Sequence, residues 1–74
     1  MEKIHIRDEF IKLGQALKLA GAVGSGVDAK IEVQSGNVKV NGEVCTQRGK
    51  KLYEGDIINF GNMEYIIACN DSEG

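Results

Sequence analysis

The order of patterns along the chain predicts an α+β fold in which two helices pack on a small antiparallel sheet of hairpins. Two stretches with helical periodicity occupy most of residues 9–35, and from residue 37 onward the sequence has the character of short strands. Two turn dipeptides, Asn41-Gly42 and Gly61-Asn62, divide this second half into hairpins. A chain of 74 residues has the size of one small domain, so we expect residues 1–74 to form a single domain.

The N-terminal part is expected to form a short strand and then a helix. Residues 4–6 alternate between apolar and polar side chains, and Asp8 is suited to cap a helix over about residues 9–20. Gly14 stands inside that helix, where glycine costs about 1 kcal/mol relative to alanine. We therefore expect another part of the chain to approach the helix closely at Gly14.

A second helix is predicted over residues 25–35. Ser25 followed by an acid at Asp28 resembles a capping box, and Gly36 is suited to end the helix. Its apolar side chains form two stripes on nearly opposite sides, Val27 with Ile31 and Ala29 with Val33. A short helix with two apolar stripes is expected to be wedged between neighbouring elements.

Two hairpins are predicted in the C-terminal half. The first turns at Asn41-Gly42, because a type I′ turn requires two residues that tolerate positive φ. Its alternation is imperfect, so a short hairpin or a bulge is expected. The second joins residues 57–60 to residues 63–69 in a regular register. Residues 46–53 are expected to form a loop, and residues 70–74 a frayed tail.

Basic residues are concentrated in the middle of a chain whose net charge is −2. Between residues 12 and 51, seven cations (Lys12, Lys18, Lys30, Lys39, Arg48, Lys50 and Lys51) stand against three acids (Asp28, Glu32 and Glu43). Local positive charge on an acidic chain is typical of a surface for an anionic partner, and we expect these cations to gather on one side. Among the aromatic residues, Tyr53 beside the basic loop is the one suited to stack on a base, whereas Phe10 and Phe60 are assigned to the core.

Several short pieces of sequence follow one another in a recognisable order. They are Leu17-Lys18-Leu19, Ser25-Gly26 with Ala29-Lys30, Gly36 with Val38-Lys39-Val40-Asn41-Gly42-Glu43, Arg48-Gly49-Lys50-Lys51-Leu52, and Gly55-Asp56. In this combination, residues 10–60 resemble the S-four-type RNA-binding domain, first known from a ribosomal small-subunit protein, and most closely its stand-alone YaaA/YbcJ-like members. The chain departs from the pattern at Phe10-Ile11-Lys12, where larger members often have Arg-Leu-Asp, and at Val27, where close relatives tend to have glycine.

The resemblance implies a helix-turn-helix-like αL motif followed by a β-hairpin, which together bind structured RNA, often in connection with ribosomes or their assembly. Carried over by position, the RNA-binding candidates are Lys18, Ser25, Lys30, Lys39, Asn41, Arg48, Lys50 and Lys51. Some of these have simpler explanations. Lys18 and Lys30 also fit solvated helix faces, Lys39 also fits a cross-strand surface position, and the turn by itself explains Asn41.

Other classes of function fit the sequence less well. A β-grasp carrier or protein-interaction domain would share the Asn-Gly hairpin, but a carrier should begin with a hairpin and end in Gly-Gly. A DNA-binding helix-turn-helix is disfavoured by Asp28 and Glu32 on its recognition helix. An enzyme is least expected, because the sequence contains no recognisable nucleophile–base pair or set of metal ligands.

The sequence also bears on cofactors and location. Two isolated cysteines and the single His5 predict no metal and no cofactor. No apolar run is long enough to cross a bilayer, so we expect a cytoplasmic protein without a membrane partner. The oligomeric state is left open.

Overall fold

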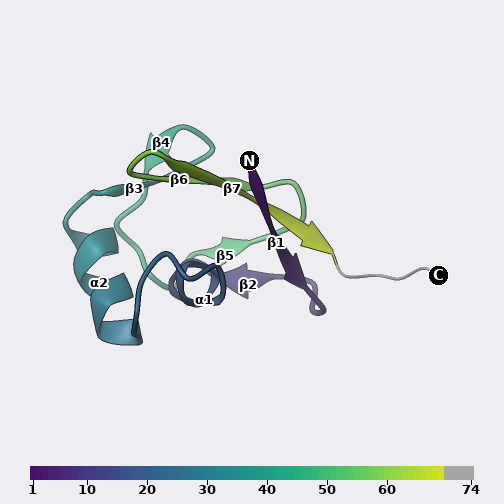
Figure 1. Cartoon of the computed structure of the whole chain (residues 1–74), viewed down its shortest axis with the longest axis horizontal. Coiled ribbons are helices and arrows are strands. Elements are labelled where there is room, and N and C mark those ends of the chain that lie inside the picture. Colours follow the sequence, from purple (N-terminus) through teal and green to yellow (C-terminus); the bar gives the residue numbers. More distant parts are fainter. Residues whose placement is uncertain (70–74) are drawn as a thin grey trace.

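The structure is a computed structural model that describes residues 1–69, so the expected tail at residues 70–74 lies outside the described residues. Figure 1 shows the order of the elements along the chain. They are β1 (Glu2–Ile6), β2 (Ile11–Lys12), α1 (Leu13–Leu19), α2 (Gly26–Gln34), β3 (Val38–Val40), β4 (Glu43–Val44), β5 (Lys51–Leu52), β6 (Ile57–Phe60) and β7 (Met63–Cys69). The predicted α+β class, with two helices followed by hairpins, is confirmed. None of the helices in residues 1–69 is long and apolar enough to cross a membrane.

Five strands form one sheet in the order β1-β7-β6-β3-β4, and β2 pairs with β5 in a separate two-stranded sheet. The neighbours β3–β4, β3–β6 and β6–β7 are antiparallel, as expected for hairpins. The β1–β7 pair is parallel, so the sheet is mixed at this edge. Because nearly the whole chain separates β1 from β7, no tight turn forces them to run in opposite directions.

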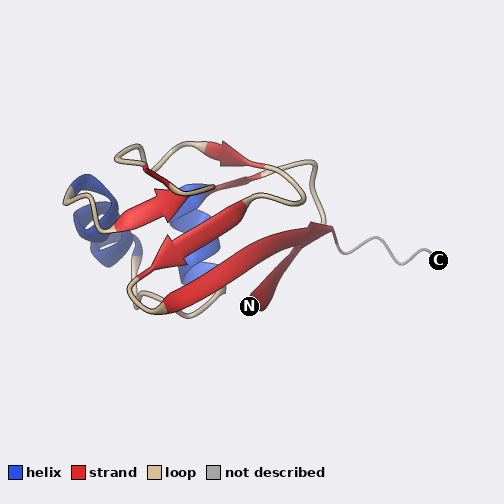
Figure 2. Cartoon of the chain, turned by 90° about the horizontal axis from the view of Figure 1, so that it is seen from above, coloured by secondary structure: helices blue, strands red, loops and turns tan. Residues whose placement is uncertain are grey.

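The helices cover one face of the five-stranded sheet. Figure 2 shows α1 behind the sheet and α2 beside one end of it. The core lies between these layers and contains alternate residues of each long strand, as a period of two requires. Its buried members are Ile4, Ile6, Leu13, Ala16, Leu17, Ala29, Val33, Val38, Val40, Leu52, Ile58, Tyr65 and Ile67.

The prediction that α1 begins near residue 9 with Asp8 as its cap is wrong. The helix begins at Leu13, its N-cap is Lys12 in extended conformation, and no side chain caps it. Residues 11–12 form β2 instead, with Ile11 opposite Leu52 and Lys12 opposite Lys51. The expected loop over residues 46–53 therefore contains strand β5. Both errors have one cause: this pairing joins segments about 40 residues apart, and local patterns carry no information about it.

The second helix agrees with the prediction in its position and its cap. The Ser25 hydroxyl oxygen accepts a hydrogen bond from the Asp28 backbone N–H at 3.2 Å. Only one of its two apolar stripes is covered, however. Ala29 and Val33 are buried, whereas Val27 and Ile31 are 67% and 54% exposed. The expectation that α2 is wedged between neighbours on both sides is wrong for the described residues.

Both predicted hairpins are present. Asn41 and Gly42 have φ values of 53° and 88°, as a type I′ turn requires, and the hairpin is short, with Val40 opposite Glu43. In the second hairpin Ile58 lies opposite Tyr65 and Phe60 opposite Met63, which confirms the predicted register.

Candidate nucleic-acid interface

Residues 48–51, here called the basic segment, are attached to the start of α1 through their backbone. The Leu13 N–H donates to the Lys50 carbonyl at 2.9 Å, and the Gly14 N–H donates to the Arg48 carbonyl at 3.0 Å. The first N–H groups of a helix have no partner within the helix, so these carbonyls take the place of a side-chain cap. The basic segment is thereby held against α1, while the side chains of Arg48, Lys50 and Lys51 remain exposed.

Gly14 allows this close approach. A β-carbon built at Gly14 would lie 2.5 Å from Cγ of Arg48 and 3.1 Å from its Cδ. Such a β-carbon would overlap the arginine side chain. The expectation that another part of the chain comes close to the helix at Gly14 is confirmed, and the part that does so is Arg48.

A pair of lysines lies next to the basic segment. Lys12 in β2 and Lys51 in β5 are direct cross-strand partners, and both are exposed. Like charges directly opposite each other in a sheet are unfavourable. The pair thus places a fourth cation, Lys12, beside Lys51 of the basic segment.

Phe10 and Tyr53 flank the lysine pair. Their ring centroids are 6.1 Å apart, with an angle of 49° between the ring planes. The Lys51 ammonium nitrogen lies 4.8 Å from the centroid of the Phe10 ring, within the range of a cation–π contact. The assignment of Phe10 to the core is wrong. Phe10 precedes β2 instead of lying on a helix, so helical spacing does not place its ring in the interior.

Two of the candidate residues have side chains that stabilise the fold. The Ser25 hydroxyl caps α2. The Asn41 side chain accepts from the Ile57 N–H at 3.0 Å and donates to an Asp56 carboxylate oxygen at 3.2 Å. Asn41 therefore ties the β3–β4 turn to the start of β6, in addition to its role in the turn.

The other candidates are lysines at separate places on the surface. Lys18 is exposed in the last turn of α1, and Lys30 is exposed on α2. Lys39 stands between Val38 and Val40, which are buried beneath the helices, so its side chain leaves the sheet on the opposite face. The expectation that all seven cations gather on one side is therefore wrong for Lys39.

Several carboxylates of the chain are engaged by neutral groups. Glu32 accepts from the Asn37 amide at 2.8 Å, and Glu64 accepts from the Asn59 amide at 3.2 Å. Asp56 accepts from the Tyr53 backbone N–H at 2.7 Å as well as from Asn41. These three acids serve turns and strand pairs, whereas Glu43 lines a surface pocket with Lys50, and Glu9 and Glu54 line one with Tyr53.

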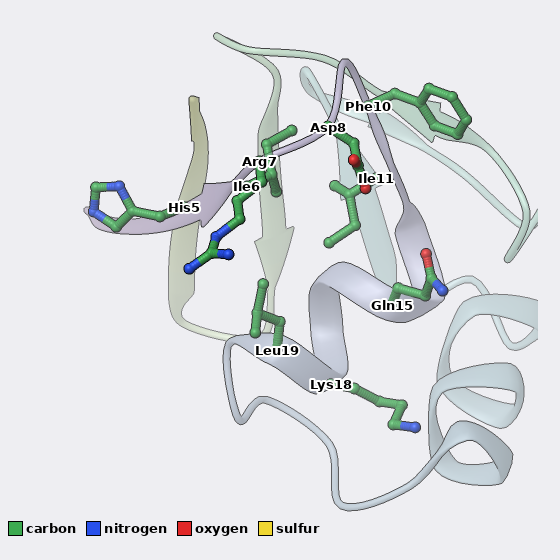
Figure 3. A pocket seen from close by; sticks show the side chains of 9 residues that line it. All are labelled: His5, Ile6, Arg7, Asp8, Phe10, Ile11, Gln15, Lys18 and Leu19. Carbon is green, nitrogen blue, oxygen red and sulfur yellow. The ribbon is translucent and has the colours of Figure 1, made fainter. Parts of the chain in front are cut away.

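Figure 3 shows a surface groove of about 580 Å³ between the end of β1 and α1. Its lining combines apolar side chains with the cations Arg7 and Lys18, the carboxylate of Asp8, and the polar side chains of His5 and Gln15. Lys18 is a candidate, whereas Arg7 is not, because it lies outside the pieces that carry the resemblance. No recognisable pattern in the sequence marks Arg7 as a residue of this groove.

Comparison with known proteins identifies the family. The profile of the S4 domain matches residues 4–68. The chain belongs to the S4 domain family. The family match confirms the resemblance found in the sequence. It does not support the β-grasp alternative.

Two relatives of this S4 domain cover most of the chain. It is 42% identical over 66 residues to "Probable ribosome maturation protein RlbA" of Bacillus subtilis. The aligned region covers 85% of this chain and 93% of the relative. It is 37% identical over 59 residues to "Putative RNA-binding protein YbcJ" of Escherichia coli. The aligned region covers 78% of this chain and 84% of the relative.

The solution structure of Escherichia coli YbcJ is similar in fold. The TM-score is 0.71 at 30% sequence identity, and the match covers 92% of this chain and 87% of that one. That structure is described as having an αL motif involved in RNA binding. The arrangement of α1, α2 and the following hairpin is thus that of a known αL structure.

Proposed function

We propose that this S4 domain binds structured RNA without catalysing a reaction, and that the binding surface is centred on the basic segment. The observation that carries the proposal is the docking of this segment on α1, which holds three exposed cations in place beside a fourth, Lys12. The name of YbcJ and the motif described for its structure support RNA as the partner. The name of RlbA supports a link to the ribosome or its assembly, and such a role places the protein in the cytoplasm.

The chemistry of these side chains suits the backbone of folded RNA. The major groove of A-form RNA is too deep and narrow for side chains to read, so double-stranded regions are recognised by shape, phosphate and 2′-hydroxyl groups. Arg48 can bind one phosphate through two parallel hydrogen bonds, whereas Lys50 and Lys51 act as mobile point charges. A β-carbon at Gly49 would meet no atom within 4 Å, so the backbone there is open to a close phosphate.

The number of cations sets the expected salt dependence. If Lys12, Arg48, Lys50 and Lys51 each neutralise one phosphate, the logarithm of the binding constant should fall with the logarithm of salt concentration with a slope of about −3 to −4. Lys18 and Lys30 would steepen that slope if the RNA extends along the helices. Lys39, on the other face of the sheet, would contribute only to an RNA that wraps around the edge.

The test is filter binding of ribosomal RNA fragments at several salt concentrations. In the triple variant Arg48→Glu, Lys50→Glu and Lys51→Glu, RNA retention at low salt should be lost while the domain remains folded. Lys50→Gln should lower the magnitude of the salt slope by about 1, because one phosphate contact disappears. Equal affinities of the triple variant and the wild type would refute the proposed surface.

Lys3→Gln is the matched control. It removes the same charge from an exposed lysine of β1 that lies between the core-facing strand positions, on the outer face of the sheet. It should leave affinity and slope unchanged. Lys39→Gln then tests whether the outer face of the sheet contacts RNA. If this variant lowers the magnitude of the salt slope as much as Lys50→Gln does, Lys39 belongs to the binding surface.

A further inference from the structure

One face of the β2–β5 ribbon carries two aromatic rings and two lysines. The register places Ile11 opposite Leu52 and Lys12 opposite Lys51. Continued by one residue, the same register brings Phe10 opposite Tyr53, and the contact between their rings agrees with this. Because side chains alternate along a strand, the aromatic pair and the lysine pair share one face, while Leu52 on the other face enters the core.

This face is open to solvent and its backbone is fixed. Tyr53 is 51% exposed. Its N–H donates to the Asp56 carboxylate at 2.7 Å, and its carbonyl accepts from the Asp56 N–H at 2.9 Å. The preceding residue, Leu52, is fully buried. Phe10 also lines the groove of Figure 3, where its ring lies at one end and extends away from Arg7 and Leu19.

An exposed tyrosine and a half-buried phenylalanine share this face with two exposed lysines. Burial of apolar area does not account for Tyr53, which is 51% exposed. The repulsion between Lys12 and Lys51 opposes the pairing of the ribbon that carries them. Both features are favourable when a planar, apolar base with flanking phosphates occupies the face, because aromatic rings stack on bases of any sequence and the lysines attract phosphates.

We propose that Phe10, Tyr53, Lys12 and Lys51 form a stacking platform for an unpaired nucleotide of the RNA. The base stacks on the exposed face of Tyr53, the Phe10 ring and its Lys51 contact support Tyr53 from the side, and Lys12 and Lys51 meet the adjacent phosphates. The inference rests on the proposed RNA-binding function and specifies the kind of RNA that is bound. The target is an RNA in which a paired region adjoins a bulge, loop or single-stranded end, and the platform has no preference among bases.

The test compares two RNA hairpins that differ in a single base. Both contain a one-nucleotide bulge in the same stem, but in one of them the bulged nucleotide is abasic, so that backbone and charge are identical. Wild-type protein should bind the RNA with the bulged base more tightly, by about 5- to 150-fold, the range expected for one base–aromatic stack. Tyr53→Leu should reduce affinity for that RNA to the level of the abasic RNA and leave abasic binding unchanged.

Two variants serve as controls. Tyr53→Phe keeps the ring and should retain the preference for the bulged base. Met63→Ala removes another exposed apolar side chain, one that is 42% exposed in the β6–β7 hairpin, and should alter neither affinity. Far-ultraviolet circular dichroism and thermal melting confirm that the variants are folded, which is expected because Tyr53 is not part of the buried core.

Tyrosine fluorescence provides an independent readout. The chain contains no tryptophan and two tyrosines, and Tyr65 is only 4% exposed. Quenching on addition of the bulged RNA should therefore come from Tyr53, and it should be absent with Tyr53→Leu and weak with the abasic RNA.

The outcomes separate the platform from the function on which it rests. If the wild type binds both hairpins equally, or if Tyr53→Leu weakens both to the same extent, the platform is refuted while RNA binding stands. If the wild type binds neither hairpin nor ribosomal RNA at low salt, both proposals are refuted.

Discussion

The contact between Gly14 and Arg48 predicts a measurable coupling between α1 and the basic segment. Gly14→Ala adds a β-carbon 2.5 Å from Cγ of Arg48, a distance at which one of the two groups must move. The Arg48 carbonyl, at 3.6 Å, is in ordinary contact and can stay in place. We therefore expect the arginine side chain to be displaced while the hydrogen bond from the Gly14 N–H to the Arg48 carbonyl persists.

Two opposing contributions set the magnitude. Replacing glycine by alanine in a helix stabilises the fold by at most about 1 kcal/mol, and less in the first turn, where Gly14 lies. Overpacking costs about 1–3 kcal/mol, and the lower end applies because the Arg48 side chain is exposed and can swing aside. In the wild-type background, Gly14→Ala should therefore change the free energy of unfolding by between about zero and −2 kcal/mol.

Arg48→Ala removes the overlap, so Gly14→Ala should become neutral or stabilising in that background. The difference between the two backgrounds, the coupling energy, is expected to be about 1–2 kcal/mol. Urea unfolding of the wild type, the two single variants and the double variant measures it. A coupling below about 0.5 kcal/mol, the usual error of additivity, would refute the contact as the reason for glycine at this position.

Gly26→Ala is the matched control for this experiment. Gly26 is the first residue of α2, and a β-carbon there would meet no atom within 4 Å. The substitution should be neutral or slightly stabilising and should show no coupling to Arg48. RNA binding adds a second readout, because Gly14→Ala should lower RNA affinity by displacing Arg48, whereas Gly26→Ala should not.

Three further substitutions separate roles in the fold from roles in binding. Lys12→Glu should stabilise the domain by a few tenths of a kcal/mol, because it converts the like-charge pair with Lys51 into an opposite-charge pair, and should weaken RNA binding; a loss of stability on thermal melting would contradict this. Ser25→Ala should cost about 1 kcal/mol of stability through loss of the α2 cap, and an unchanged salt slope would assign Ser25 to the fold alone. Asn41→Gly keeps a backbone that tolerates positive φ but removes the side-chain bonds to Asp56 and to the start of β6, so it should cost about 1–3 kcal/mol in urea unfolding; a neutral result would mean that the turn conformation alone requires Asn41.

The site could be predicted from the sequence only in part. The basic segment is visible as a cluster of charges in the sequence, and the resemblance is the basis for proposing RNA as its ligand. Phe10, Lys12 and Arg7 are not among the candidates, because Phe10 and Lys12 stand where the chain departs from the family pattern and Arg7 precedes the residues that resemble it. Phe10 and Lys12 reach the basic segment only through the pairing of β2 with β5.

The sequence by itself determined the α+β class, the cap of α2 at Ser25 and the two hairpin turns. Each of these depends on residues that are close together in the chain, such as a hydroxyl three residues before an N–H group or two adjacent residues with positive φ. Only the tertiary structure decided where α1 begins, on which face of the sheet Lys39 lies, and which aromatic residues meet the lysines. These depend on contacts between distant segments, and such contacts arise from the packing of the whole core instead of from any local pattern.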